Sequence, residues 1–288
     1  MEAAVERQAV ATVKASGKSP ASRARRRAHS EKTIQTIYRK LAREWGAQHW
    51  WPAETPFEVI VGAILTQNTS WTNVGRAMQS LRAAEVLSVE GIRDTPLHEL
   101  ERLVRPSGYF RQKARRLKGF VAWVDAKYGG SLEAMFSTAT DELRAELLKQ
   151  NGIGPETADS ILLYAGLHAI FVVDAYTRRL LERHKVIRAS AKYDEIRELV
   201  EGALRNEDIP LSHAKARERP VAHAPSAMSR AQQSALSRVY NEMHGLLVQA
   251  GKHYCFRRQP DCGGCPLGEM LTTAEKRRLQ GPGDIRKR

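Results

Sequence analysis

The chain has 288 residues and a net charge of +14, with 46 Lys and Arg against 32 Asp and Glu. That excess predicts a polyanionic partner, nucleic acid above all, although a basic protein without such a partner would show the same balance. We expect no membrane span and no secretory leader, because no apolar run reaches about 18 residues and the N-terminus lacks an apolar core. The three cysteines, all between 255 and 265, do not suit a disulfide framework and favour a reducing compartment, so we expect the cytoplasm. With a nucleic-acid partner, we expect association with the nucleoid.

The N-terminal region changes character near residue 30. Residues 1–30 are rich in Ala, Ser, Lys and Arg, and they predict a disordered basic arm that adds non-specific DNA affinity or is merely a solvated tail. Residues 31–45 have the apolar spacing of an amphipathic helix. A capping box at Thr55, with proline next to it, then opens a helix that is apolar nearly all round, which predicts the buried centre of the fold.

Helical patterns dominate the remainder, whereas strand signals are scarce, so we expect an all-α fold. The polar segment 206–230 contains three prolines and predicts a flexible insertion, and residues 272–288 predict a basic tail. The expected helices lie at about 70–84, 96–104, 111–128, 140–150, 175–184 and 230–249.

Gly152-Ile153-Gly154 forms a tight turn between two of the predicted helices. Gly152 tolerates positive φ, and Pro155 suits the first position of the second helix, in which Thr157 follows. The backbone N–H groups of the turn and the positive end of the helix dipole favour the binding of a DNA phosphate of any sequence. The alternative is a plain helical hairpin with a glycine turn.

Asp174 directly follows the apolar run Ile170–Val173. A carboxylate beside that much apolar surface is poorly solvated, so we expect a raised pKa and a role in attack on a sugar–base bond. The alternative role is the N-cap of the helix that begins at Ala175. The two roles are compatible.

Four ordered segments resemble the helix-hairpin-helix, glycine/proline-rich, aspartate superfamily of DNA glycosylases, and most of all the relatives of endonuclease III. The segments are FEVIVGAILTQNT (57–69), SGYFRQKA (107–114), LLKQNGIGPETA…VVDAY (147–176) and GKHYC (251–255). The resemblance covers about 31–271 and implies two helical domains, 57–186 and 31–56 with 187–271. It also implies that a monomer holds damaged double-stranded DNA in the cleft between them.

By the same resemblance, several residues are assigned to DNA. Asp174 would stabilise the positive charge on the sugar, Gln67 beside Asn68 would fill the gap left by the flipped base, and Tyr109 or Phe110 would wedge the opposite strand. The alternatives are a polar helix terminus for Gln67 and ordinary packing for the two aromatic residues. Further candidates for DNA contact are Gly152, Ile153, Gly154, Thr157 and Lys113, the last on the basic helix 111–118 that could equally be a solvated face. Candidates to stack the base, or to lie in the core, are Trp71, Tyr164 and Tyr176.

Two departures from the family pattern bear on chemistry. Glu156 stands where bifunctional members carry a lysine nucleophile, and a carboxylate cannot form an imine. We therefore expect a monofunctional glycosylase, with Glu156 near the flipped sugar or base, or merely stabilising the helix N-terminus. Weak lyase action through Lys113 or Lys149 stays open. Gly62 lies at or near the position of the catalytic glutamate of adenine-removing members, which argues against that substrate.

A third departure concerns the cysteines. Cys255, Cys262 and Cys265 match three ligands of the family's [4Fe–4S] loop, but the fourth position falls at Leu271. An incomplete or substituted cluster, no metal, and zinc with help from His253 all remain open. No cofactor is needed for the chemistry in any of these cases.

The resemblance favours alkylated purines such as 3-methyladenine as the substrate, because the lysine-free subgroup resembles a 3-methyladenine type. Uracil or thymine mispaired with guanine comes second. The sequence is also compatible with a glycosylase that has AP lyase activity, or with a DNA-binding protein that senses lesions without catalysis.

Overall fold

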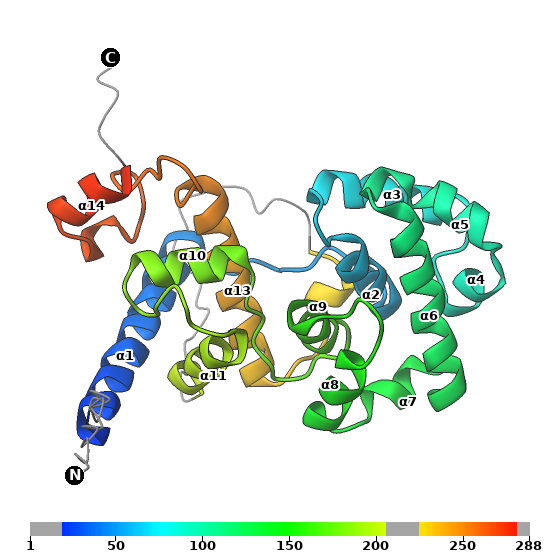
Figure 1. The fold of residues 1–288 in the computed structure, drawn as a ribbon, viewed down its shortest axis with the longest axis horizontal. Helices are drawn as coiled ribbons and strands as arrows, with labels where there is room; N and C mark the ends of the chain where they lie inside the picture. The colour runs from blue at the N-terminus through cyan, green and yellow to red at the C-terminus, as the bar shows by residue number, and fades with distance from the viewer. Residues whose placement is uncertain (1–18, 206–224, 281–288) are drawn as a thin grey trace, which may run out of the picture.

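The computed structural model describes residues 19–205 and 225–280, and these ranges are helical without a strand. The all-α prediction is confirmed. Figure 1 shows two groups of helices side by side, with the first and last helices of the chain on the same side. We call the group that contains the glycine hairpin the hairpin lobe and the other the terminal lobe.

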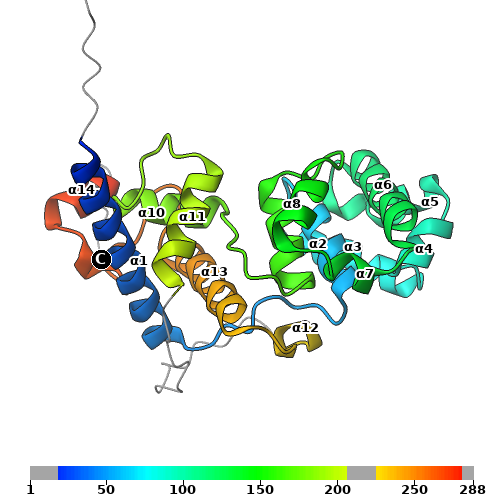
Figure 2. The same ribbon diagram turned by 90° about the horizontal axis from the view of Figure 1, so that it is seen from below.

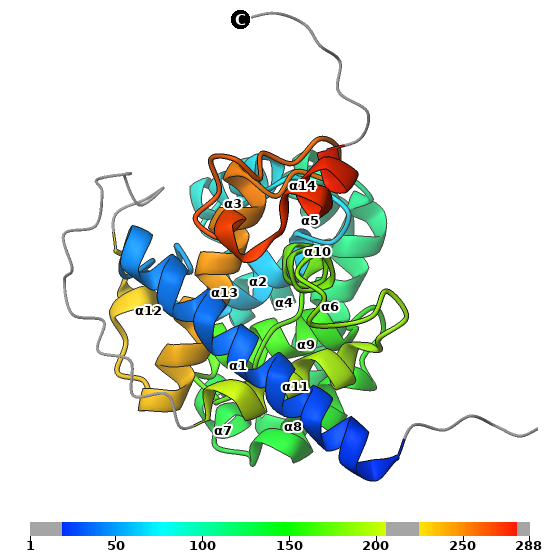
Figure 3. The ribbon, with the colours of Figure 1, turned by 90° about the vertical axis from the view of Figure 1, so that its left-hand side faces the viewer.

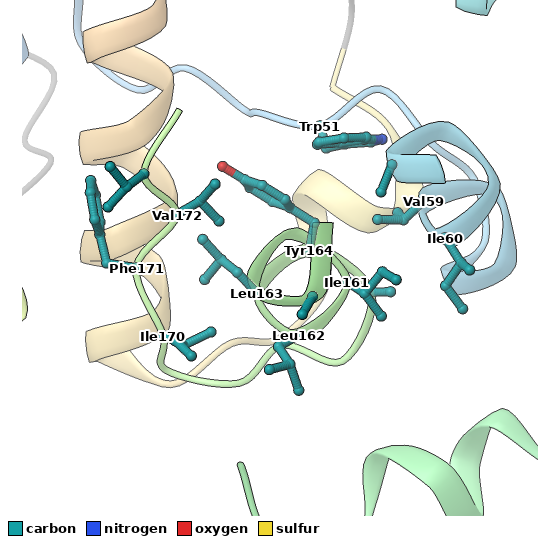
Figure 4. Close-up of a cluster of buried hydrophobic side chains, with 14 of the residues drawn as sticks. Trp51, Val59, Ile60, Ile161, Leu162, Leu163, Tyr164, Ile170, Phe171 and Val172 are labelled. Atoms are coloured by element: carbon teal, nitrogen blue, oxygen red, sulfur yellow. The ribbon is translucent and has the colours of Figure 1, made fainter. Parts of the chain in front are cut away.

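The hairpin lobe is one continuous stretch of helices around the apolar helix α2 (Pro56–Leu65). Every residue of α2 after Pro56 is buried, in agreement with the predicted buried centre. Figure 4 shows part of this core, where Val59 and Ile60 of α2 lie near Ile161 of the second hairpin helix. The elements of the hairpin lobe are α2 (Pro56–Leu65), α3 (Trp71–Ala83), α4 (Val89–Asp94), α5 (Leu97–Leu103), the 3₁₀ turn η1 (Arg105–Ser107), α6 (Phe110–Tyr128), α7 (Leu132–Phe136), α8 (Thr140–Leu148), α9 (Pro155–Ser160) and the π turn η2 (Ile161–Ala165).

The terminal lobe combines the first helix with the last third of the chain. In Figure 3, α1 (Pro20–Trp45) crosses diagonally in front of α13 (Ala235–His253) and α11 (Tyr193–Leu204). Its buried side chains, Ile34, Ile37 and Leu41 among them, follow the helical spacing expected from the sequence. The elements of this lobe are α1 (Pro20–Trp45), α10 (Ala175–Arg183), α11 (Tyr193–Leu204), α13 (Ala235–His253), the 3₁₀ turn η3 (Gly268–Met270) and α14 (Thr273–Gln280).

The boundary between the lobes differs from the predicted one. Helix α10 packs against α13, so it belongs to the terminal lobe although the predicted domain 57–186 included it. Its buried Leu180 and Leu181 are the reason, because their apolar side chains need cover that α13 supplies. The chain therefore changes lobe within 166–174, just before Asp174 caps α10. Residues 46–55 make the other crossing, from α1 to α2 (Figure 2).

The prediction of a disordered arm over 1–30 is wrong from residue 19 onward. Helix α1 begins at Pro20, and the Ser19 hydroxyl accepts a hydrogen bond from the Ser22 N–H at 3.3 Å. A serine cap, proline in the first turn and Ala/Arg-rich residues favour a helix even where its face is solvated. Residues 1–18 lie outside the described part of the chain.

The predicted insertion 206–230 and tail 272–288 are also partly ordered. Helix α12 (Ala227–Arg230) follows Ser226, whose hydroxyl donates to the Trp51 carbonyl at 2.8 Å, and the Met228 N–H donates to the Ala53 carbonyl at 3.1 Å. These long-range bonds explain why the polar composition was misleading. Helix α14 likewise occupies 273–280 of the tail, whereas 206–224 and 281–288 lie outside the described residues.

Candidate active site between the two lobes

A cavity of about 800 Å³ opens where the two lobes meet. Segments that are distant in the sequence line it, so no single motif defines its shape. The lining comes from the linker residues 50–51, the turn 66–72, the hairpin residues 152–157, the crossing segment 172–176 and one face of α13, together with Ala63, Arg116 and Ser160.

Asp174 lies in this cavity with its side chain 13% exposed. One carboxylate oxygen accepts the Thr177 N–H at 2.7 Å, so the predicted N-cap role is confirmed. The expected raised pKa is wrong. Burial does raise the pKa of Asp174, but His244 and the Thr177 hydrogen bonds together outweigh burial and bring the pKa below its usual value. The carboxylate is therefore ionised at neutral pH.

His244 of α13 was not predicted from the sequence. Its Nε2 atom lies 3.6 Å from the second oxygen of Asp174, and its Nδ1 atom lies 2.5 Å from the Tyr164 hydroxyl. The imidazole is 5% exposed and Tyr164 is 2% exposed. Figure 4 shows the Tyr164 ring beside Trp51, with its hydroxyl directed toward α13. The sequence offers one weak indication that His244 belongs to the site, namely a histidine among the apolar residues of α13.

Glu156 faces the same cavity from the first turn of α9. Its side chain is exposed to solvent at the mouth of the cavity. Burial and the neighbouring Asp174 carboxylate raise the pKa of Glu156 to about 7, although His244 lowers it in part. Two carboxyl groups whose pKa values are pushed apart are typical of sites where one acts as an acid and the other stays charged.

Two indole rings, those of Trp51 and Trp71, line another part of the cavity. Trp51 meets Trp71 edge-on at 5.0 Å between ring centroids and tilts over Tyr164 at 4.9 Å. A Cβ atom at Gly62 would lie 3.3 Å from the Trp51 ring, so this position must stay small for the indole to sit there. Trp71 is 36% exposed and lines the cavity together with Tyr176, whereas Tyr164 is a core residue. The tryptophans at 50 and 51, in the linker, were not predicted.

The glycine hairpin is held by Arg116 of α6. Gly152 has φ +78°, and a Cβ atom there would collide with the Arg116 side chain at 2.1 Å. The Arg116 guanidinium donates to the Gln67 side chain, which donates in turn to the Gly152 carbonyl at 2.8 Å and to the Thr157 hydroxyl at 3.0 Å. Gln67 is thus folded back against the hairpin and would have to swing out to enter a DNA stack.

The other predicted DNA contacts fall at two places. Asn68, with φ +54°, lies at the rim of the cavity, and Gly154 is exposed at the hairpin, whereas Ile153 is buried beneath it. Tyr109 is 65% exposed with φ +47°, which suits a projecting wedge. Phe110 is partly buried, and the guanidinium groups of Arg105 and Arg111 lie 5.7 and 5.5 Å from its ring centroid.

Lys113 does not fit the role of a phosphate contact. It is 1% exposed, and its ammonium donates to the Leu65 and Ser107 carbonyls at 2.8 and 2.6 Å. Burial lowers the pKa of Lys113 to about 8, with the Arg116 charge adding to the effect. The reason is geometric, because the helical period turns this residue inward while Arg115 and Arg116 line a groove of about 450 Å³ beside the hairpin.

Lys252, at the end of α13, is the lysine of the described chain that lines the cavity. Its ammonium lies 5.2 Å from the Trp50 ring centroid. Burial lowers the pKa of Lys252, and Asp174 raises it in part. By contrast, the Lys149 side chain is 68% exposed and pairs with Glu146, outside the cavity.

The cysteine loop follows α13 and lies against α10. Cys255, Cys262 and Cys265 surround a small pocket with Leu271, which is 8% exposed and occupies the fourth ligand position with a hydrocarbon side chain. Arg183 closes the loop by donating to the Cys255 sulfur at 3.1 Å and to the Phe256 carbonyl at 2.7 Å. Among the described residues, no three His, Cys, Asp or Glu side chains are arranged to hold a metal ion.

Comparison with known proteins agrees with this geometry. The model of HhH-GPD superfamily base excision DNA repair proteins matches residues 61–206. A protein of Methanocaldococcus jannaschii named as a DNA repair glycosylase is 42% identical over 239 residues, which are 82% of this chain and 94% of that protein. The chain belongs to the HhH-GPD superfamily. It is therefore a DNA N-glycosylase of base excision repair, as its sequence motifs predicted.

Two solved structures are similar to this glycosylase. A 3-methyladenine DNA glycosylase of H. pylori, bound to 1,N6-ethenoadenine, is 28% identical with a TM-score of 0.60, covering 77% of this chain and 97% of that one. A non-covalent endonuclease III–DNA complex has a TM-score of 0.64 at 20% identity, covering 87% and 99%, and this likeness is one of fold. No helix in the described ranges has the length and apolar character that crossing a membrane demands.

Proposed function

We propose that this glycosylase removes alkylated purines from double-stranded DNA and does so by hydrolysis, without cutting the strand. One observation carries the proposal: the cavity that holds Asp174 is walled by indoles and presents a carboxyl group, Glu156, where a lysine nucleophile would be needed. The H. pylori relative, which is named for 3-methyladenine and was solved with ethenoadenine, supports the same substrate class.

Aromatic walls suit 3-methyladenine because methylation of a purine ring nitrogen places positive charge on the base. A flipped cationic purine gains stacking and cation–π attraction from electron-rich indole faces. Trp51 and Trp71 offer such faces in the cavity, and the small Gly62 leaves them room. An unmodified purine lacks the charge and gains less from the same contacts.

The two carboxyl groups divide the chemistry between them. As the sugar–base bond breaks, positive charge grows on the sugar, and the ionised Asp174 stabilises this charge and orients the attacking water. Glu156 is partly protonated near pH 7 because of its raised pKa, so it can donate a proton to a neutral leaving base such as ethenoadenine. A base that is already cationic leaves without this proton.

The first experiment uses purified protein and duplexes that carry 3-methyladenine, ethenoadenine, uracil opposite guanine or thymine opposite guanine. Strand breaks that appear with the alkylated substrates, only after hot alkali and only with an intact Asp174, would support the proposal. Release of uracil or thymine alone would transfer the assignment to mismatch repair. Binding without any break would identify a lesion sensor.

Lyase activity through Lys252 is the second candidate, since this amine faces the cavity with a lowered pKa. Borohydride would trap a covalent imine with abasic DNA if that activity exists. We expect no trapped complex. A complex that forms with the wild type and disappears in Lys252→Ala would replace the hydrolytic assignment with a bifunctional one.

We also propose that the cysteine loop is closed by Arg183 and Leu271 without a metal. The support is the donor set, in which a leucine side chain fills the fourth position and the guanidinium already satisfies one sulfur and a loop carbonyl. The basic residues of the loop remain available for the DNA backbone.

A further inference from the structure

We propose that Tyr164 and His244 form a buried relay that positions the Asp174 carboxylate and keeps it ionised for base release. The inference rests on the proposed function and adds two positioning residues to it. Neither residue needs to contact the DNA, because each would act through Asp174.

The contacts connect three elements in series, from η2 through α13 to the start of α10. The Tyr164 hydroxyl of η2 lies 2.5 Å from His244 Nδ1, and His244 Nε2 lies 3.6 Å from an Asp174 oxygen at the start of α10. The π turn that contains Tyr164 interrupts the helical register of the hairpin, and such turns re-aim a side chain. Trp50 and Phe171 meet the imidazole edge-on, so the ring has little freedom to rotate.

The placement of protons follows from the partners. Burial and the charges of Asp174 and Glu242 raise the pKa of Tyr164, so its hydroxyl keeps its proton. In the relay this hydroxyl donates to Nδ1, 2.5 Å away, and the ring N–H at Nε2 faces the carboxylate. Nε2 is buried and has no other hydrogen-bond partner. At 3.6 Å the contact is longer than a hydrogen bond, and such contacts often shorten when the substrate binds.

The relay explains how an almost buried carboxylate remains charged. Burial opposes the ionised form of Asp174, as does the neighbouring carboxyl of Glu156 on α9. Three groups favour the ionised form of Asp174: the Thr177 N–H, His244 and the Lys252 ammonium at the end of α13. Lys252 carries its charge on a long flexible stem, whereas the imidazole is fixed by packing. His244 is thus the fixed donor on the second oxygen.

The test is a pH profile of single-turnover base release from 3-methyladenine DNA. Removing the donor with His244→Phe, which keeps an aromatic ring, should move the acidic limb upward by about 1 pH unit or more and leave DNA affinity within twofold. His244→Gln, which restores an N–H donor, should recover part of the shift. Tyr164→Phe should produce a smaller shift in the same direction, because Nδ1 loses the donor that fixes the tautomer.

Tyr240→Phe is the matched control. This tyrosine also lies on the buried side of α13, but its hydroxyl bonds to the Glu201 carbonyl, away from Asp174. Its loss should leave the pH profile unchanged. Nitrogen-15 NMR of histidine-labelled wild type gives a second readout that needs no variant to fold: a His244 ring with a protonated Nε2 and a bare Nδ1 supports the relay, and the opposite tautomer overturns it.

The inference can fail independently of the proposed function. If the wild type releases no base, the proposed function fails first. If release depends on Asp174 while His244→Phe and Tyr164→Phe keep the wild-type acidic limb, the glycosylase assignment stands and the relay is wrong.

Discussion

The two walls of the cavity are built in different ways. The hairpin wall consists of the turn 66–72, the residues 152–157 and Asp174, and each of these lies in a local motif that the sequence displays. The opposite wall, which we call the tryptophan wall, consists of Trp50 and Trp51 with the cavity-facing residues of α13. No motif marks it, because its two parts are far apart in the sequence and meet only by packing. The motif supplies the Asp174 carboxylate, whereas the packing supplies the environment that sets its pKa.

In the hairpin wall, the largest loss of base release is expected for Asp174→Asn. Asparagine is an equally good N-cap and keeps an oxygen for the Thr177 N–H, so the fold and DNA binding should persist. Without the charge, base release should fall by about 100-fold to 1000-fold, the scale seen when one electrostatic stabiliser is removed. Single-turnover assays beside Asp125→Asn, a surface carboxylate paired with Arg93, provide the control. Wild-type turnover by Asp174→Asn would remove this residue from catalysis.

Glu156→Gln separates the two carboxyl groups from each other. For ethenoadenine, wild-type release should decline as pH rises through about 7, because the proton on Glu156 is lost there. The glutamine variant should release ethenoadenine about tenfold to hundredfold more slowly, without this alkaline decline. Release of the cationic 3-methyladenine should change little. Equal losses on both substrates would assign Glu156 to the sugar rather than to the leaving base.

Trp50→Ala probes the tryptophan wall. The ring packs on His244 and beneath the Lys252 ammonium, and it lines the cavity. Loss of one stacking surface costs about 1–3 kcal/mol, which predicts roughly tenfold to hundredfold weaker use of alkylated DNA. Trp123→Ala, which removes a partly buried tryptophan packed on Phe120 and Tyr128 outside the cavity, should reduce only the melting temperature. If both variants lose activity equally, the wall has no specific role.

The smallest effect on catalysis is expected at the cysteine loop, which lines a separate pocket. Arg183→Ala should destabilise the fold by about 1–3 kcal/mol, because the loop carbonyls and one thiol lose their donor. Arg258→Ala, in the exposed part of the loop, is the control for melting. Chelation of the wild type should change neither melting nor base release. Stoichiometric iron or zinc in the purified protein would refute the metal-free loop.

The sequence predicted well wherever function depends on short spacing. A glycine turn, a proline at the next helix start and a capping aspartate are local devices, so the residue order alone was enough to assign Gly152, Pro155 and Asp174. It predicted poorly wherever the answer depends on which way a helix faces. Lys113 carries the same charge as Arg115 and Arg116 on one basic helix, yet only tertiary packing turns the lysine inward to two carbonyls.

Composition misled for a related reason. Residues 19–30 and 226–230 have polar or charged sequences, but a serine cap orders the first and bonds to the linker carbonyls order the second. In the second segment, distant partners that composition cannot reveal offset the entropy cost of ordering the chain.

By itself the sequence determined that this is an all-α DNA glycosylase with a capping aspartate at 174 and glutamate rather than lysine at 156, because motifs of that kind act through the backbone and a few neighbouring residues. Only the tertiary structure decided the charge state of Asp174, the raised pKa of Glu156 and the aromatic lining of the cavity. Each of these depends on the burial and electrostatic field created when α13 and the linker 46–55 close over the hairpin lobe, and such fields arise from groups far apart in the chain.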